Sequence, residues 1–147
     1  MRPVLLAEDN ANDVELTIAA LRAVRVANEV VVVSDGVEAL DFLLHRGAFA
    51  ERAAEMPAVV MLDLKMPRLG GLETLRQIRA EPALRAVPVV ILSSSRSAAE
   101  VLHAYSLGAN AYVVKPVHCD RFVNAVGDLA AFWVDVNEPA PVPALVG

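Results

Sequence analysis

The stretch Ala58-Val59-Val60-Met61-Leu62-Asp63 decides the fold of this chain. Its five apolar residues follow one another without polar alternation, which is typical of a strand that is buried on both faces. Such strands belong to parallel sheets that are covered by helices. Four more short apolar runs of this kind occur along the chain: Val4–Ala7, Val30–Val33, Val87–Leu92 and Ala111–Val114. The sequence therefore predicts a parallel sheet of five strands.

The segments between these runs have the pattern of amphipathic helices. Three N-caps are expected, each with a glutamate three positions later that completes a capping box: Asn12 with Glu15, Asp35 with Glu38, and Ser97 with Glu100. The third helix is expected to begin at Gly71 and to end before Pro82. The fourth should stop at Gly108, and the last should follow Pro116. The alternation of strand and helix, repeated five times, predicts an α/β, doubly wound (βα)5 fold.

One domain accounts for most of the chain. We expect it to span residues 1–133 and to be followed by an apolar, Pro-rich tail, residues 134–147, in which three prolines prevent a regular helix. The connection between the second helix and the third strand is unusually long. Its Ala50–Glu55 stretch is expected to form an extra helical turn because of its helix-forming composition.

The composition excludes several classes of protein. Of the 147 residues, 56% are apolar and 21% are charged, which is incompatible with intrinsic disorder. The net charge of −5 argues against direct nucleic-acid binding, and no basic cluster suits an anionic membrane. The single cysteine, Cys119, cannot form an internal disulfide, so a reducing cytoplasm is the expected location.

Polar residues follow the expected strands at the point where each strand ends: Glu8 and Asp9, Asp63, Ser93, and Lys115. Because the carboxyl ends of parallel strands meet at one edge of a sheet, we expect these side chains to converge. Carboxylates about 4 Å apart repel by roughly 4 kcal/mol per pair at an effective dielectric near 20. A cation must lie among them or one must be protonated, and oxygen ligands of this kind suit Mg²⁺.

An aspartate beside Mg²⁺ and a lysine can accept a phosphoryl group as an acyl phosphate. Lys115 would neutralise phosphoryl oxygens, and the Ser93 hydroxyl could donate to one of them. Each feature alone has an ordinary structural explanation, since an acidic pair after a strand commonly caps a helix and a Lys-Pro pair commonly forms a turn. Their joint occurrence at one sheet edge favours phosphoryl chemistry.

The chain resembles the receiver domain of two-component response regulators over residues 1 to about 133. Four stretches carry the resemblance, in this order: LLAEDN (5–10), VVMLDLKMP (59–67), VVILSSS (89–95) and AYVVKP (111–116). The resemblance implies a flavodoxin-like receiver fold with strand order 2-1-3-4-5. It also implies that Asp63 is phosphorylated by a histidine kinase or a phosphotransfer protein.

The resemblance assigns further roles at the strand ends. Asp9 and Asp63 would bind Mg²⁺ directly, together with the backbone carbonyl of Lys65, and Glu8 would act through a bound water. An aspartate is common in the family where this chain has Glu8, and the longer glutamate suits a water-mediated role.

Three residues near the end of the domain would carry the switch. Lys115, followed by a cis bond to Pro116, would pair with the phosphoryl group. Ser93 and Tyr112 would form the switch pair, so that Tyr112 packs inward when Ser93 turns toward the phosphate. The surface of the helix opened by Ser97, the following strand and the last helix would change with them.

The stretch Val37–Leu44 and the insertion after it are similar to regulators that are paired with phytochrome light-sensing kinases. No output domain follows, so we expect a single-domain regulator that does not bind DNA in cis. The fourth helix, the fifth strand, the last helix and the apolar tail are expected to form a homodimer interface.

Three alternatives remain at this stage. A Mg²⁺-dependent phosphatase with an aspartyl nucleophile commonly has a second aspartate where this chain has Lys65. An FMN carrier would need a phosphate-binding loop where Glu8 and Asp9 stand. A receiver that binds partners without phosphorylation would normally have lost Asp63 or Lys115. We therefore expect a phosphoacceptor signalling protein rather than an enzyme.

Overall fold

The computed structural model describes residues 2–115 and 120–141, and strands and helices alternate along them. The strands are β1 (Val4–Ala7), β2 (Val30–Val33), β3 (Val59–Asp63), β4 (Val89–Ser93) and β5 (Ala111–Val114). The helices are α1 (Ala11–Ala23), α2 (Gly36–Leu43), α3 (Gly71–Ala80), α4 (Ala98–Ser106) and α5 (Asp120–Ala131). Short turns complete the list: η1 (Gly47–Phe49), η2 (Pro82–Leu84) and a π-helical turn, η3 (Phe132–Val136). The predicted alternation is confirmed.

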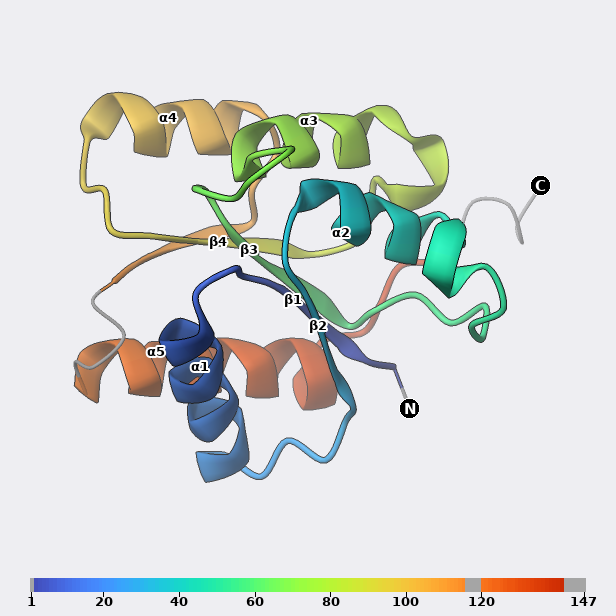
Figure 1. Cartoon of the computed structure of the whole chain (residues 1–147). Coiled ribbons are helices and arrows are strands. Elements are labelled where there is room, and N and C mark those ends of the chain that lie inside the picture. The colour runs from blue at the N-terminus through green and yellow to red at the C-terminus, as the bar shows by residue number, and fades with distance from the viewer. Residues whose placement is uncertain (1, 116–119, 142–147) are drawn as a thin grey trace.

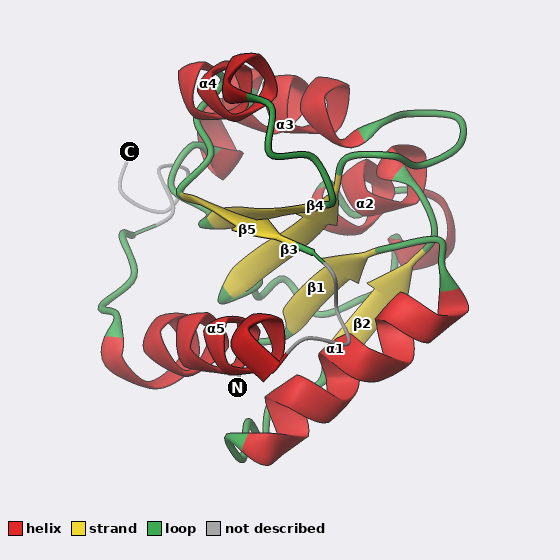
Figure 2. Ribbon diagram, turned by 90° about the vertical axis from the view of Figure 1, so that its left-hand side faces the viewer, coloured by secondary structure: helices red, strands yellow, loops and turns green. Residues whose placement is uncertain are grey.

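The five strands form one parallel sheet in the order β2-β1-β3-β4-β5, which confirms the predicted doubly wound topology. Helices α1 and α5 cover one face of the sheet, and α2, α3 and α4 cover the other (Figure 1). The view in Figure 2 shows the same three layers from the side. Strands β1, β3 and β4 lie between these layers and are fully buried along their length.

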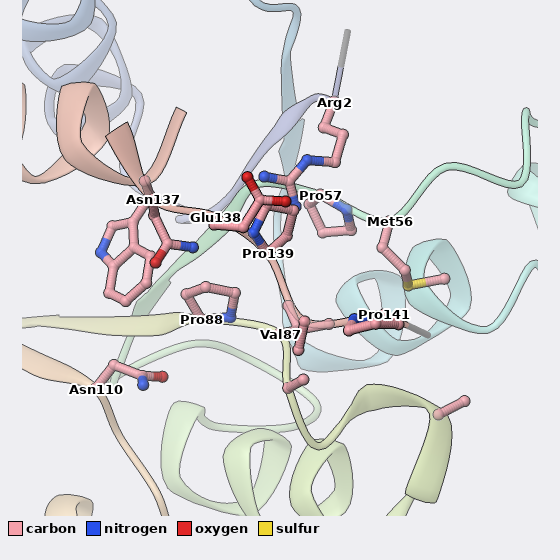
Figure 3. A pocket seen from close by; sticks show the side chains of 14 residues that line it. Arg2, Met56, Pro57, Val87, Pro88, Asn110, Asn137, Glu138, Pro139 and Pro141 are labelled. Atoms are coloured by element: carbon pink, nitrogen blue, oxygen red, sulfur yellow. The ribbon is translucent and has the colours of Figure 1, made fainter. Parts of the chain in front are cut away.

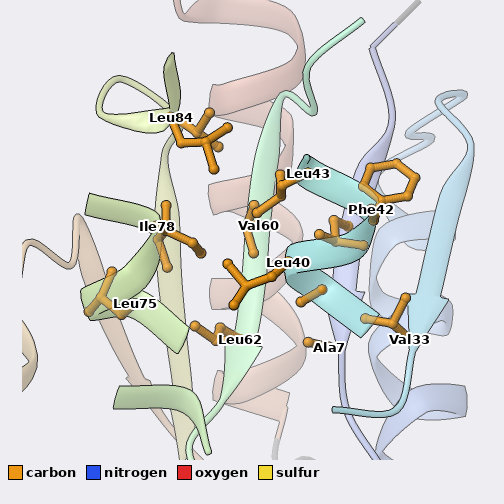
Figure 4. Packing of buried hydrophobic residues seen from close by; sticks show 14 of the residues in the cluster. Ala7, Val33, Leu40, Phe42, Leu43, Val60, Leu62, Leu75, Ile78 and Leu84 are labelled. Carbon is orange, nitrogen blue, oxygen red and sulfur yellow. The ribbon is translucent and has the colours of Figure 1, made fainter. Parts of the chain in front are cut away.

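Two hydrophobic cores lie on the two faces of the sheet. Alternate residues of β1 face opposite cores, so that Leu5 packs beneath α2 and α3 while Leu6 packs against α1 and α5. Strand β3 divides in the same way, with Val60 and Met61 on opposite faces. Figure 4 shows the first of these cores. Burial on both faces is the reason why these strands are apolar at every position.

The caps of α2 and α4 are confirmed, and the expected cap of α1 is wrong. Asp35 accepts a hydrogen bond from the backbone N–H of Glu38, and Ser97 caps α4. Helix α1 begins two residues earlier than predicted, because Asn10 accepts from the N–H of Asp13 at 3.0 Å. Asn12 consequently lies inside the first turn and is exposed.

The helical turn predicted over Ala50–Glu55 is also wrong, since the turn that forms is η1, three residues earlier. Tertiary packing overrides local helix propensity here. Phe49 packs edge-on against Phe42, with ring centroids 5.2 Å apart. The guanidinium of Arg52 lies 4.0 Å above the Phe42 ring and donates to the Phe42 carbonyl.

The predicted ends of α3 and α4 are confirmed, with α3 ending before Pro82 and Gly108 adopting a φ of +104° just after α4. The expected role of Pro116 before the last helix, its cis bond and Cys119 lie outside the described residues. The helical segment continues through η3 to Val136, and residues 137–141 follow without a helix. Among the described residues, no helix is both long enough and apolar enough to cross a bilayer.

Candidate functional site

The residues predicted at the strand ends meet at the carboxyl edge of the sheet: Glu8 and Asp9 follow β1, Asp63 ends β3, Ser93 ends β4, and Lys115 follows β5. The backbone N–H of Lys115 donates to the carbonyl of Ser93 at 2.8 Å, which extends the pairing of β5 with β4 to this edge. The fold therefore delivers a lysine from the sheet's outermost strand to the acidic residues of its central strands.

Lys115 is the centre of the site. Its Nζ atom donates to Glu8 Oε2 at 2.8 Å, to Asp13 Oδ2 at 2.8 Å and to Asp63 Oδ1 at 3.0 Å. The lysine side chain is only 11% exposed. An ammonium group has three N–H donors, so carboxylates engage all of them.

The carboxylates outnumber this cation. Burial raises the pKa of Asp63, and repulsion from Asp9 and Asp13 adds to the shift, while Lys115 opposes it. Burial also raises the pKa of Glu8, against the opposing effect of the same ammonium group. Burial by itself would lower the pKa of Lys115, but the carboxylates outweigh it and raise that pKa. The site is short of positive charge.

Three of these carboxylates can hold a metal ion. Ligand oxygens of Glu8, Asp9 and Asp63 lie within 4.8 Å of one another, with Glu8 and Asp63 buried and Asp9 exposed. Hard oxygen donors with one side open to water fit a divalent cation such as Mg²⁺ or Mn²⁺. The raised pKa values of Glu8 and Asp63 indicate that their charged forms are poorly stabilised, and such an ion would stabilise them. Lys65 lies two residues after Asp63, in an exposed loop.

The predicted switch residues are joined through the loop that follows β4. Ser93 is buried, and its hydroxyl oxygen accepts a hydrogen bond from the backbone N–H of Ser95 at 3.1 Å. The Tyr112 hydroxyl donates to the carbonyl of the same Ser95 at 2.9 Å. The tyrosine is half-buried and packs against the core beneath α4. A movement of this loop would therefore reach both side chains.

The loop after β3 is braced by the start of α2. Arg68, at a φ of +59°, donates to the buried carboxylate of Asp35 at 2.7 Å. The Gly36 N–H donates to the carbonyl of Leu69 at 3.1 Å. At the end of the loop, Gly71 must be glycine because a Cβ atom there would lie 2.4 Å from a backbone oxygen of β3. The second half of the loop that carries Lys65 is thus held by α2 and by β3.

Asp13 is the site residue that the sequence analysis missed. It lies in the first turn of α1, and its contact with Lys115 spans 102 residues of sequence. The available signal was its spacing, since an acid three residues after the correct cap, Asn10, lies in the first turn of α1, close in sequence to the end of β1.

A cavity of about 240 Å³ lies at the opposite edge of the sheet (Figure 3). Residues 137–141 form one wall, and the segments that lead into β3 and β4 form the other. Arg2 and Glu138 contribute charged groups, and Pro57 and Pro88 are among the apolar residues that line the cavity. The acidic cluster is not part of it.

Comparisons with known proteins agree with this geometry. The model of the response regulator receiver domain matches residues 4–127. Response regulator Rcp1 of Synechocystis sp. is 30% identical over 138 residues, which cover 93% of this chain and 92% of Rcp1. The Mn²⁺-bound form of response regulator Rcp1 has a TM-score of 0.85 at 28% identity, covering 96% of this chain and all of that one.

Two further solved structures are similar. The phosphorylated cyanobacterial phytochrome response regulator RcpA has a TM-score of 0.85 and is 34% identical, covering 95% of this chain and 99% of its own. The bacteriophytochrome response regulator AtBRR has a TM-score of 0.77 and is 49% identical, covering 94% of this chain and 99% of its own.

Proposed function

The chain belongs to the response regulator receiver family, and we propose that it accepts a phosphoryl group on Asp63 from a histidine kinase. One observation carries the proposal. The Asp63 carboxylate lies 3.0 Å from the Lys115 ammonium, and one of its oxygens lies within 4.8 Å of carboxylate oxygens of Glu8 and Asp9. A nucleophilic carboxylate, a fixed cation and a set of metal ligands are the groups that phosphoryl transfer requires.

In the proposed step, a carboxylate oxygen of Asp63 forms a bond to phosphorus. The bond between phosphorus and the imidazole nitrogen of the donor histidine breaks, its electron pair stays on that nitrogen, and the nitrogen takes up a proton. A phosphoryl oxygen then becomes an acceptor for the Lys115 ammonium, because negative charge moves outward to the phosphoryl group.

We propose Mg²⁺ as the cation of this site, held by Asp9, Asp63 and the Lys65 carbonyl, with Glu8 acting through water. The ion, when bound, neutralises charge on the carboxylates and on the entering phosphoryl oxygens. The donor set of three carboxylates supports this choice, as does the Mn²⁺-bound form of the similar protein Rcp1.

The switch would follow from the same transfer. The Ser93 hydroxyl would turn to donate to a phosphoryl oxygen and would give up its contact with the N–H of Ser95. Because the Tyr112 hydroxyl is bonded to the Ser95 carbonyl, the loop would carry the change to β5 and α4. Phosphorylation would then alter the surface of α4, β5 and α5.

We also propose that this surface, with the tail, forms a homodimer and that the chain acts without binding nucleic acid. Leu102 and Tyr105 of α4 and Phe132 of η3, which follows α5, are exposed apolar side chains that support a docking surface. The mass of the full chain in solution, measured by light scattering at tens of micromolar, should be that of a dimer. A monomer mass would remove this proposal.

The proposed donor is a phytochrome-type kinase, because RcpA and AtBRR are phytochrome response regulators. Phosphotransfer from such a kinase should be faster than from an unrelated histidine kinase at equal concentration. Equal rates would contradict the pairing and leave the role of Asp63 intact.

Acetyl phosphate with Mg²⁺ tests the central proposal. We expect one acid-stable, base-labile adduct per chain, located on Asp63 by mass spectrometry and lost in Asp63→Asn. Asp128→Asn removes the same charge from an exposed position on α5 and should label normally. An adduct that persists in Asp63→Asn would refute the assignment. Many turnovers of a small phosphate ester would favour a phosphatase instead.

A further inference from the structure

We propose that Asp13 is a positioning residue that holds Lys115 in the unphosphorylated protein and competes with the phosphoryl group for its ammonium. The inference rests on the proposed function, because it concerns what Lys115 must release when a phosphoryl group arrives. Its basis is the contact between Asp13 Oδ2 and Lys115 Nζ at 2.8 Å, as short as the contact with Glu8.

Every N–H donor of Lys115 is engaged by a carboxylate, as described above. A phosphoryl oxygen can therefore gain a full hydrogen bond from this ammonium only if one carboxylate gives up its own. Binding of the phosphoryl group thus includes the cost of an ion pair that must be broken.

The three carboxylates differ in how readily they can release the lysine. Glu8 is 1% exposed, and its other oxygen accepts from the N–H of Asn10, so its position is fixed. Asp63 is itself the proposed acceptor. Asp13 is 21% exposed, so water can replace the ammonium at its carboxylate at the lowest cost.

The position of Asp13 on α1 supports the same conclusion. It occupies the first turn, where the positive end of the helix dipole stabilises a carboxylate whether or not Lys115 is bound. Its oxygens are not among the ligand atoms grouped within 4.8 Å, which belong to Glu8, Asp9 and Asp63. Asp13 therefore acts on the lysine rather than on the metal ion.

Two consequences follow for the chemistry of the site. Asp13 keeps the ammonium beside Asp63 before transfer, which prevents the long lysine side chain from turning into solvent. It also offsets part of the charge that Lys115 would offer to the phosphoryl group, which weakens the phosphorylated state. The residue thereby sets the balance between the two states of the switch.

Beryllofluoride, a phosphoryl analogue that binds aspartate non-covalently, tests this at saturating Mg²⁺ by calorimetry. We expect Asp13→Asn to bind beryllofluoride about fivefold more tightly than the natural chain. This ratio corresponds to a partly exposed ion pair of about 1 kcal/mol that the variant does not have to break. Mg²⁺ affinity, measured separately, should change less than twofold. Asp13→Ser provides a second variant with the same expected direction, and Asp13→Glu should return toward the natural affinity.

Glu15→Gln is the matched control, because it removes the same charge from an exposed position of the same helix. Equal tightening in Glu15→Gln would overturn the inference, since it would reveal a general charge effect. Unchanged or weaker binding in Asp13→Asn would overturn it as well and leave the proposed function standing. Failure of the natural chain to bind beryllofluoride would instead count against the proposed function.

Discussion

Arg79 and Lys115 are half-buried cations at opposite edges of the sheet, and their partners differ in kind. Arg79 donates to four backbone carbonyls and to the Asn110 side chain, all of them neutral, at 2.8–3.2 Å. Lys115 donates to three carboxylates. Burial lowers the pKa of Arg79, whereas the surrounding carboxylates raise that of Lys115.

This difference separates a structural cation from one that can change partners. The carbonyls around Arg79 belong to η2, to the entry to β4 and to the turn after α4, so its planar guanidinium joins three segments in one geometry. The partners of Lys115 are acids in excess of the positive charge, and an incoming ion or phosphoryl group can rearrange them. The sheet edge that holds Arg79 therefore stabilises the fold, and the edge that holds Lys115 carries the reactive groups.

The largest effect is expected from Arg79→Ala. Several carbonyls would lose their donor together, which should lower the free energy of unfolding by about 3 kcal/mol. Arg79→Lys should recover little of this, because a single ammonium cannot span the same set of acceptors. Urea unfolding at neutral pH measures both changes.

Arg76→Ala serves as the control, since Arg76 is exposed on the same helix and pairs with Glu73 at the surface. Its unfolding midpoint should stay close to that of the natural chain. If Mg²⁺ restored the stability of Arg79→Ala, the two edges would not be independent and the comparison would fail.

A smaller loss of about 2 kcal/mol is expected for Lys115→Met in the presence of a chelator, because three carboxylates lose their shared counter-ion. Millimolar Mg²⁺ should recover most of this loss, since the ion supplies the missing charge to Glu8 and Asp63. Unfolding in urea, with and without Mg²⁺, gives the answer.

Arg96→Met removes a positive charge from an exposed position in the loop after β4 and provides the control for charge alone. Arg96→Met should neither lose unfolding free energy in the presence of a chelator nor gain it when Mg²⁺ is added. A Lys115→Met protein whose deficit was the same with and without Mg²⁺ would show that the lysine is a structural cation like Arg79.

The strands and the residues at their ends could be predicted because each depends on a local pattern, whereas the order of the strands came from the resemblance to receiver domains. An unbroken apolar run indicates a strand of a covered parallel sheet, although the edge strands β2 and β5 are only partly buried, and the residue after the run indicates what stands at the sheet edge. Asp63 and Lys115 were found in this way, and the structure brings their side chains to 3.0 Å.

The contacts of Asp13 and Arg79 were not predicted, because their partners depend on tertiary placement as well as on local pattern. The partners of Arg79 are mostly backbone carbonyls, which every residue has. The most distant partner in the sequence, the Asn110 side chain, lies 31 positions from Arg79. The contact of Asp13 depends on where α1 begins, and the choice of Asn12 over Asn10 as its cap displaced that start by two residues. The helix propensity of Ala50–Glu55 also gave a wrong prediction, because the packing of Phe49 on Phe42 places the turn at η1 instead.

Asp35 is a buried carboxylate near the same edge of the sheet as Lys115, but its ionised form is stabilised by its neighbours. Burial would raise its pKa, but hydrogen bonds from Arg68 and from the N–H of Glu38 prevail and lower it below the ordinary value of 3.8. A lowered pKa means that the ionised form stabilises the fold above about pH 3.8, and that this contribution is lost as pH falls through the folded-state value.

We therefore expect Asp35→Asn to lower the free energy of unfolding by about 1 kcal/mol at neutral pH, because its amide oxygen still caps α2 but the charge facing Arg68 is lost. The deficit should begin to shrink as pH falls below about 3.8, where the unfolded chain takes up a proton at this position, and should vanish below the lowered pKa, where Asp35 of the folded natural chain is protonated too. Asp41→Asn, which alters a partly exposed ion pair between α2 and Arg46, should have little effect at any pH. A deficit in Asp35→Asn that stayed constant from pH 7 to pH 3 would mean that the charge of Asp35 facing Arg68 contributes nothing, and that Asp35 is not stabilised in its ionised form any more than the similarly buried Glu8 and Asp63.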